Sequence, residues 1–562
     1  MSRFDRALDK VRQYVRSGLG ADATAACIVA VMLVPQAMAY AMLAGLPPVI
    51  GLYASTFPLL AYALIGTSRQ LAIGPVAMLS ILVAGSCSRF ASPGSPEYLS
   101  VVAILTLEVG VLQLILGVVR MGFLVNFVSH AVIGGFTSAA AIVIGMSQLK
   151  HILGIPLPDE HTVVPLLLAV PKVISEVNLY TAAIGVVSIA VLVVFKLRKV
   201  RFPGPLLIVF GCTLLMYLLR HSDLGIKTVG HVPRGLPDFA VPSIQFQTVR
   251  DLLPIALTVL FIGYMESIAV AEWVSAKKRY PVDANRELGG LGLANIVASV
   301  FSGYPVTGGL SRTAVNYQAG ARTRLAGVFT AVLVIIALMV LTPLFYYLPK
   351  CVLSAIIIVA VAGLVDLKEP RHLFNVKKTD GWIYVFTFAA TLFVGLEQGL
   401  LGGIALSLIV FVRRSAHPHA AELGYLESED VFRNVKRFPE ARTFPEALIL
   451  RVDASLYFAN MGFVERLVRS RIEERVSVKW VVFDLTGVND MDAVAVSRFE
   501  RLIDDYRERG VTFLFAAMKG PVRDVIARAA WAEKYGSSVD YVSVQTALEG
   551  TGLLERSRAR SS

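Results

Sequence analysis

The sequence has few of the features on which soluble enzymes depend. Charged residues make up only 17% of its 562 residues, against 55% that are hydrophobic, and the mean hydropathy is +0.65. Its four cysteines, Cys27, Cys87, Cys212 and Cys351, are scattered through apolar segments without metal-ligand spacing, so we expect neither disulfides nor a metal site. The sequence also has no nucleophile motif and no cofactor-binding loop. We therefore expect a polytopic membrane protein that is not an enzyme and needs no cofactor.

Charge is concentrated near the end of the chain. Residues 421–562 hold nearly half of the charged residues, which indicates a soluble domain after the apolar region. The net charge of +12 would suit nucleic-acid binding, but the other basic residues lie mostly between apolar segments, where they orient a membrane protein. We expect no nucleic-acid partner. Residues 1–20 are basic and lack the features of a signal peptide, so they are predicted to form a cytoplasmic N-terminal segment.

The apolar region, residues 21–414, divides into fourteen predicted transmembrane spans. Their approximate ranges are 22–42, 49–66, 71–88, 99–119, 127–149, 178–196, 204–220, 251–275, 287–302, 307–319, 323–343, 349–366, 381–396 and 399–412. Basic residues follow the even-numbered spans from the sixth onward, for example Lys196, Arg198, Lys199 and Arg201, so both termini are predicted to face the cytoplasm. An even number of spans can form two repeats of seven with opposite orientation.

The tenth predicted span is interrupted and carries a charge. Pro305, Gly308 and Gly309 precede a helix-competent run over residues 311–315, and Arg312 lies in that run. Such a break leaves a helix N-terminus inside the membrane, where its free N–H groups and positive dipole end are available to an anion. A kinked structural helix whose arginine extends to the membrane surface is the alternative. Because ionisable residues inside membranes are usually functional, we favour an anion site.

The third predicted span has the same design. Gly74 and Pro75 stand ahead of a helical run within residues 70–80, and proline suits the first turn of a helix. The third and tenth spans occupy corresponding positions in the two repeats. Paired broken helices of this kind indicate the binding site of a transporter built from inverted repeats.

Two polar side chains of the first span are candidates for the same site. Gln36 and Tyr40 are four residues apart and therefore share one face of a helix. They could line a pocket, or they could bond to a neighbouring helix.

The eighth span contains a carboxylate among apolar residues. Burial of Glu266 would favour its neutral form, which makes it a candidate proton carrier. An ion pair with Arg312 is the alternative. Glu108, in the fourth span, has similar apolar neighbours, and the sequence does not assign it a role.

Four motifs together resemble the SulP family of anion transporters, the sulfate permeases. These are VPQAMAYAMLAGLPPVIGLYAS, GTSRQLAIGPVAML, GYMES and GGLSRTAVN. The resemblance implies a core domain and a gate domain, with an anion held between the half-helices of spans three and ten. The residues that it assigns to this substrate site are Gln36, Tyr40, Val76, Ala77, Leu310, Ser311 and Arg312. It matches Glu266 to a carboxylate associated with cation coupling. Sodium-coupled members tend to carry a hydroxyl residue where this chain has Val270, which favours protons.

The C-terminal region is predicted to be a polar linker, residues 415–436, followed by an α/β domain, residues 437–556. Apolar runs such as ALILRV and KWVVFDL are typical of buried strands, and they alternate with segments of helical periodicity. RVDASLYFAN and DLTGVNDMD resemble the STAS domain that ends most SulP transporters. Bacterial relatives of this domain have a phosphorylatable serine after the aspartate that matches Asp492. Ala493 stands there, so phosphorylation at that site is not expected.

The sequence therefore predicts a proton-coupled sulfate importer of the cytoplasmic membrane that forms a homodimer. Dicarboxylate and bicarbonate remain alternative substrates. An anion channel, an exchanger or an anion-gated sensor remains an alternative mode of action.

Overall fold

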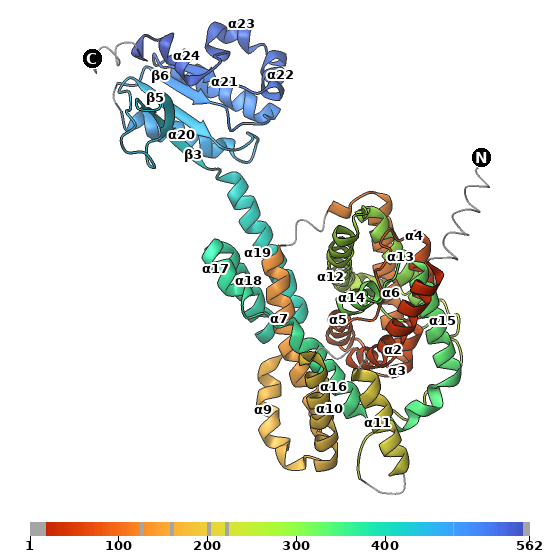
Figure 1. Ribbon diagram of the computed structural model, residues 1–562. Helices are drawn as coiled ribbons and strands as arrows, with labels where there is room; N and C mark the ends of the chain where they lie inside the picture. The colour runs from red at the N-terminus through yellow and green to blue at the C-terminus, as the bar shows by residue number, and fades with distance from the viewer. Residues whose placement is uncertain are drawn as a thin grey trace, which may run out of the picture. The chain divides into compact units, whose positions relative to one another are not determined.

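The computed structural model describes residues 18–123, 129–157, 162–198, 204–219, 224–475 and 477–554. The chain forms two compact units, residues 1–407 and 408–562 (Figure 1). Most of the predicted N-terminal segment 1–20 lies outside the described residues, as do Lys199 and Arg201 of the basic loop after the sixth predicted span.

The first unit is helical. Its helices are α2 (Leu19–Leu43), α3 (Pro48–Tyr53), α4 (Phe57–Ile65), α5 (Ala77–Cys87), α6 (Pro96–Val118), α7 (His130–Ser147), α8 (Leu149–Leu153), α9 (Val163–Val173), α10 (Leu179–Leu197), α11 (Gly204–Leu218), α12 (Phe246–Lys278), α13 (Ala284–Val300), α14 (Leu310–Gln318), α15 (Leu325–Val340), α16 (Lys350–Val361), α17 (Glu369–Val376), α18 (Lys378–Phe393) and α19 (Leu396–Ala416), the last of which continues into the second unit. Among the described residues, eight helical segments are long and apolar enough to cross a membrane. Shorter apolar helices include α5, α11 and α15. The count of fourteen spans stays a prediction.

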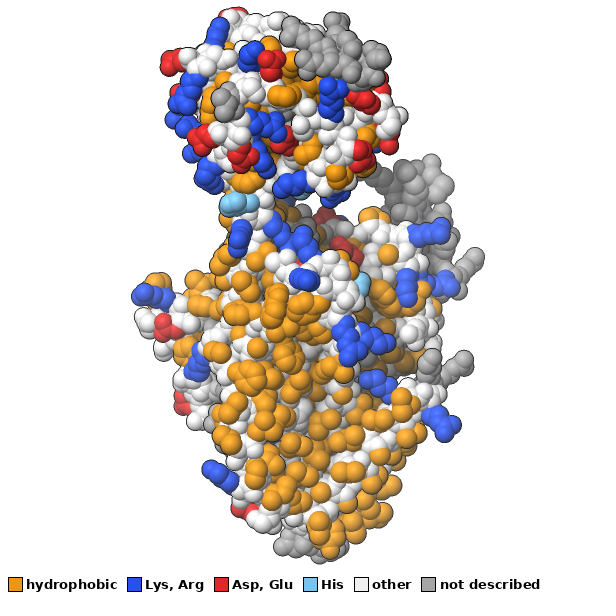
Figure 2. All heavy atoms as spheres, turned by 90° about the vertical axis from the view of Figure 1, so that its left-hand side faces the viewer, with side chains coloured by type: hydrophobic (Ala, Val, Ile, Leu, Met, Phe, Trp, Pro, Cys, Tyr) orange, Lys and Arg blue, Asp and Glu red, His pale blue; other side chains and the backbone are white. Residues whose placement is uncertain are grey.

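Large hydrophobic side chains cover the outside of the helical unit. Figure 2 shows a broad hydrophobic surface on one face, with the lysines and arginines gathered toward its edges. Leu168, Val187, Trp382 and Phe386 are among the exposed apolar residues. An apolar surface of this extent suits contact with lipid and not with water.

Glycines allow α6 and α13 to pack closely. A Cβ atom on Gly110 would lie 2.6 Å from the backbone nitrogen of Ile296, and one on Gly292 would lie 2.6 Å from that of Leu114. Small residues at such positions are typical of helix packing in membranes, where close approach of two backbones supplies the attraction.

The two predicted breaks meet at the centre of this unit. Strand β1 (Ile73–Gly74) pairs antiparallel with β2 (Thr307–Gly308), and each strand comes shortly before a short helix, α5 or α14. The interruptions of the third and tenth spans are thereby confirmed. Pairing satisfies backbone groups that would otherwise be left without hydrogen bonds inside the membrane.

The second unit contains a five-stranded mixed sheet of order β4-β3-β5-β6-β7. Its strands are β3 (Ala420–Leu426), β4 (Val431–Asn434), β5 (Ala447–Val452), β6 (Trp480–Asp484) and β7 (Thr512–Ala516), and its helices are α20 (Met461–Glu473), α21 (Ala493–Arg507), α22 (Gly520–Arg528), α23 (Trp531–Tyr535) and α24 (Val544–Glu549). Strands β5, β6 and β7 are parallel, as strands separated by helices require. Phe483, Phe499, Phe515 and Trp531 form an aromatic cluster in its core.

The structure corrects the predicted linker over residues 415–436. Strands β3 and β4 lie within this range and form an antiparallel hairpin, and β3 also pairs with β5. The sheet therefore begins before residue 437. Polar residues such as Glu427, Glu429 and Asp430 gather at the turn between the two strands, and a short polar stretch of this kind is easily taken for a linker.

Candidate functional site

A cavity of about 520 Å³ lies beside the paired breaks. All eight residues predicted for substrate binding or proton coupling line it. They are Gln36, Tyr40, Val76, Ala77, Glu266, Leu310, Ser311 and Arg312. These residues come from α2, α5, α12 and α14 or the residues just before them, which are far apart in the sequence.

Two helices begin at the wall of this cavity. Helix α5 follows Val76 and helix α14 follows Gly309, and neither has a side chain that caps its first turn. The first N–H groups of a helix have no partner within the helix itself, and the helix dipole makes this end positive. Both helix starts therefore offer donors and partial positive charge to an anion in the cavity.

Arg312 supplies a full positive charge at the same place. Its side chain is only 2% exposed, and Nη1 donates a hydrogen bond of 2.6 Å to the carbonyl oxygen of Pro75. Nε and Nη2 are buried and have no hydrogen-bond partner among the described residues. Arg312 therefore does not extend to the membrane surface. Its two remaining donors require an acceptor, and an anion in the cavity would supply one.

Hydrogen bonds across the breaks fix the position of Arg312. The backbone N–H of Gly309 donates to the oxygen of Ala72 over 3.1 Å, and the N–H of Ala72 donates to Oγ1 of Thr313 over 3.0 Å. One turn further along α14, Nδ2 of Asn316 donates to the oxygen of Gln70 over 2.9 Å. These contacts join the two half-helix regions into one rigid frame for the guanidinium.

Glu266 lines the cavity without pairing with Arg312. Its buried Oε2 atom has no hydrogen-bond partner among the described residues, and Nε and Nη2 of Arg312 have none either. The alternative of a direct ion pair is therefore not seen in this conformation. One turn along α12, Val270 is buried and adds no oxygen ligand for a cation. The neighbouring Ser267 instead receives a 2.7 Å hydrogen bond from the N–H of Gly308 and so holds β2 against α12.

Gln36 and Tyr40 also face the cavity. The two residues are 8% and 7% exposed, and among the described residues neither side chain bonds to a neighbouring helix. Both residues therefore line the cavity, and their contact with an anion stays a prediction. The amide N–H groups of Gln36 and the phenol O–H group of Tyr40 can donate hydrogen bonds to an anion in the cavity.

The opposite wall of the cavity was not predicted. It is formed by α10, the start of α11 and the end of α16, and it is mostly apolar, with Leu192, Phe195 and Ile356 among its residues. It also contains Lys196, which the sequence pattern had assigned to membrane orientation alone. No local signal separates this lysine from the other basic residues of its loop.

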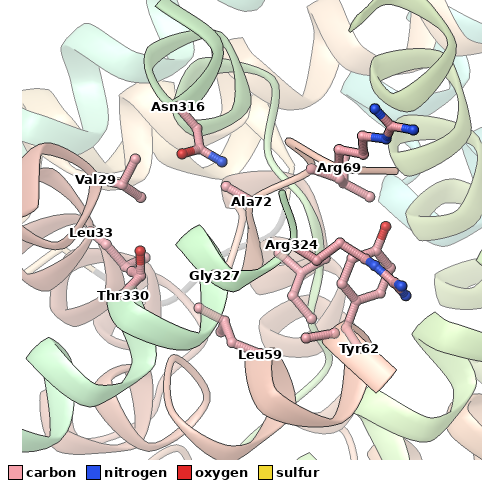
Figure 3. A pocket seen from close by; sticks show the side chains of 13 residues that line it. Val29, Leu33, Leu59, Tyr62, Arg69, Ala72, Asn316, Arg324, Gly327 and Thr330 are labelled. Atoms are coloured by element: carbon pink, nitrogen blue, oxygen red, sulfur yellow. The ribbon is translucent and has the colours of Figure 1, made fainter. Parts of the chain in front are cut away.

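A second pocket lies near the same breaks and is far smaller. It has a volume of about 20 Å³ and is lined by Tyr62, Arg69, Asn316 and Arg324, among others (Figure 3). This volume is sufficient for roughly one water molecule. It therefore does not compete with the larger cavity as a site for a polyatomic anion.

Half-helices that meet head to head beside a cavity, with a buried arginine between them, define a membrane transporter for anions. Comparison with known families agrees with this class. The chain belongs to the Sulfate permease family, whose model matches residues 19–387, and residues 438–540 match the STAS domain. This family consists of transporters and not of enzymes.

Individual relatives extend over nearly the whole chain. Sulfate transporter 4.1, chloroplastic, of Arabidopsis thaliana is 38% identical over 94% of this chain and 79% of its own length. A probable sulfate transporter of Mycobacterium tuberculosis is 31% identical over 96% of both chains. Among solved structures, SLC26A9 superposes with a TM-score of 0.89 at 26% identity, covering 98% of this chain and 93% of its own. The transmembrane domain of the cyanobacterial bicarbonate transporter BicA shares the fold, with a TM-score of 0.61 at 22% identity over 69% of this chain and 97% of its own.

Proposed function

We propose that this protein is a secondary transporter that takes up sulfate together with protons. The observation that carries the proposal is the pair of unsatisfied donors on Arg312, held between two uncapped helix starts. A compact anion with oxygen atoms on all sides can accept from the guanidinium and from the helix N-termini at once. Relatives that carry the name sulfate transporter support the choice of sulfate among such anions.

The seven residues Gln36, Tyr40, Val76, Ala77, Leu310, Ser311 and Arg312 are proposed to surround the anion, with Glu266 as the proton carrier. An ionised carboxylate in the same cavity would repel the anion, whereas a protonated one would not. Proton and anion binding should therefore favour each other. Dicarboxylate, bicarbonate and uncoupled exchange or channel activity are the competing outcomes of the test below.

Uptake of labelled sulfate into proteoliposomes tests the proposal. The purified protein is expected to accumulate sulfate faster when the outside is more acidic than the inside, because the proton gradient then drives the anion inward. Excess unlabelled sulfate should compete strongly, and malate, bicarbonate or chloride weakly. If another anion competes more strongly than sulfate, that anion is the better candidate for the substrate. An uptake rate that does not depend on the pH gradient would contradict proton coupling.

We propose the cytoplasmic membrane as the location, with both termini in the cytoplasm. The basic loops after even-numbered predicted spans support this orientation. One plant relative is named chloroplastic, so the fold alone does not determine which cellular membrane contains the protein.

The C-terminal unit is proposed to stabilise a homodimer and to regulate the rate, without forming part of the anion path. It is charged, and those of the described residues that line the cavity lie in the first unit. Removal of residues 417–562 is expected to lower expression or uptake rate and to leave the order of anion preference unchanged. The cut precedes β3, so the whole sheet is removed. A truncated protein with a different anion preference would contradict this assignment.

A further inference from the structure

Lys196 occupies an unexpected place in the cavity. It lies in the last turn of α10, and its Nζ atom is 3.1 Å from the point that a Cβ atom on Gly363 would occupy. Gly363 itself follows α16 and lines the cavity. The ammonium group therefore bridges the ends of α10 and α16, on the wall opposite the half-helices.

The charged residues that line the cavity can be named for the described part of the chain. There the lining includes two basic residues, Arg312 and Lys196, and one acidic residue, Glu266. Among the described residues, no carboxylate forms an ion pair with Lys196. Around it the wall is apolar, with Leu192 and Phe195 from the same helix. Lys196 is exposed and has no carboxylate partner among the described residues, so its positive charge can act on anions at this end of the cavity.

The ends of the lining helices show which way the cavity opens. Its lining includes residues from the early part of α2, the end of α10, the start of α11 and the 3-10 turn after α16, where Ile28, Lys196, Gly204 and Leu364 lie. If the N-terminus faces the cytoplasm, each of these helix ends belongs to the cytoplasmic side of its predicted span. The cavity therefore extends from Arg312 toward the cytoplasm, and Lys196 lies at its mouth.

We propose that Lys196 is a second anion-contacting residue, which binds sulfate or a similar oxyanion transiently at the cytoplasmic mouth before it reaches Arg312 or after it leaves. This proposal rests on the proposed transport function and adds to it a cytoplasmic contact site that Arg312 alone would not provide. An anion that moves through the cavity would then meet one positive charge at the mouth, on Lys196, and a second beside the half-helices, on Arg312.

A lysine at the end of α10 has another ordinary explanation. Basic residues at helix C-termini interact favourably with the helix dipole, and basic loops orient membrane proteins. Arg198 is the matched control for both effects. It caps the C-terminal end of the same helix and is exposed, but it does not line the cavity. If Lys196 acts only through the dipole or orientation, neutralising either residue should have the same result.

The test compares sulfate uptake by inside-out and right-side-out membrane vesicles. For Lys196→Gln, the half-saturating sulfate concentration is expected to rise about threefold or more at the cytoplasmic face, the range of an exposed charge contact. It should stay unchanged at the outer face. The effect should shrink at high ionic strength, where mobile ions screen an accessible charge. Lys196→Arg should retain most of the parent value, and Arg198→Gln should match the parent at both faces.

Each outcome separates this proposal from the proposed function. If the parent protein transports sulfate and Lys196→Gln behaves like Arg198→Gln at both faces, the role of Lys196 is refuted while the transport function stands. An equal rise of the half-saturating sulfate concentration at both faces would also refute it, because a residue at the cytoplasmic mouth should affect binding from the cytoplasmic face only. If the parent vesicles transport no sulfate at all, the proposed function fails first and this proposal fails with it.

Discussion

Arg312→Gln is expected to weaken sulfate binding by about tenfold to a hundredfold. A charge-assisted hydrogen bond contributes about 1.5–3 kcal/mol, and about 1.4 kcal/mol corresponds to a factor of ten. Glutamine retains a polar side chain but removes the charge and the fork of donors at Nε and Nη2 that have no partner among the described residues. Equilibrium binding of labelled sulfate to the purified protein measures the effect directly.

Two further variants make this test specific. Arg312→Lys keeps the positive charge but loses the planar donor geometry, so it should fall between the parent and Arg312→Gln. Arg322→Gln removes an exposed arginine ten residues further along, which does not line the cavity. Its binding should equal that of the parent. A folded Arg312→Gln protein that binds sulfate as tightly as Arg322→Gln would show that the arginine is structural.

The broken helices could be predicted because their signals are local. Proline and glycine inside an apolar span, as at Pro75 and Gly309, are visible in any short window of sequence. An arginine within a few residues of the break then indicates that the ligand is negatively charged. The structure confirms that the two breaks meet, and it brings the eight predicted residues to one cavity.

The contacts that give the site its geometry could not be predicted in the same way. The bond between Arg312 and the oxygen of Pro75 joins residues 237 positions apart, and nothing in either segment identifies the other as its partner. Lys196 shows the same limit. Its neighbours in sequence are a basic loop, whereas its neighbours in space, such as Gly363, belong to a helix more than 150 residues away. Patterns along the chain describe helix faces, and long-range packing decides which faces meet.

The hairpin β3–β4 was missed for a different physical reason. Of these two strands only β4 is an edge strand of the sheet, and it is four residues long with no buried residue, so it has almost no hydrophobic signal. Leu423 and Tyr425 are buried, but charged residues before and after them dominate the local composition. The parallel strands β5 and β6 were recognised because they are buried on both faces and form continuous apolar runs.

The proton-coupling role of Glu266 leads to the second large effect. Glu266→Gln fixes the side chain in a neutral form that resembles the protonated acid. The variant should still bind sulfate and exchange labelled for unlabelled sulfate, because a neutral residue does not repel the anion. It should lose the acceleration of uptake by an inward proton gradient, so that the ratio of rates with and without the gradient falls to about one.

Glu108→Gln is the matched control for this experiment. Both carboxylate oxygens of Glu108 are buried and have no hydrogen-bond partner among the described residues, yet Glu108 does not line the cavity. A carboxylate that lies outside the cavity cannot repel an anion bound there, so its protonation should not be coupled to anion binding. We therefore expect Glu108→Gln to retain gradient-driven uptake.

The two variants together decide which carboxylate carries the proton. Loss of acceleration in Glu266→Gln alone supports the assignment, because only Glu266 shares the cavity with Arg312. If Glu266→Gln still accumulates sulfate in response to external acid as the parent does, Glu266 is not the coupling residue. Loss of acceleration in Glu108→Gln instead would move the proton site to α6, and coupling would then have to pass through helix packing and not through direct repulsion in the cavity.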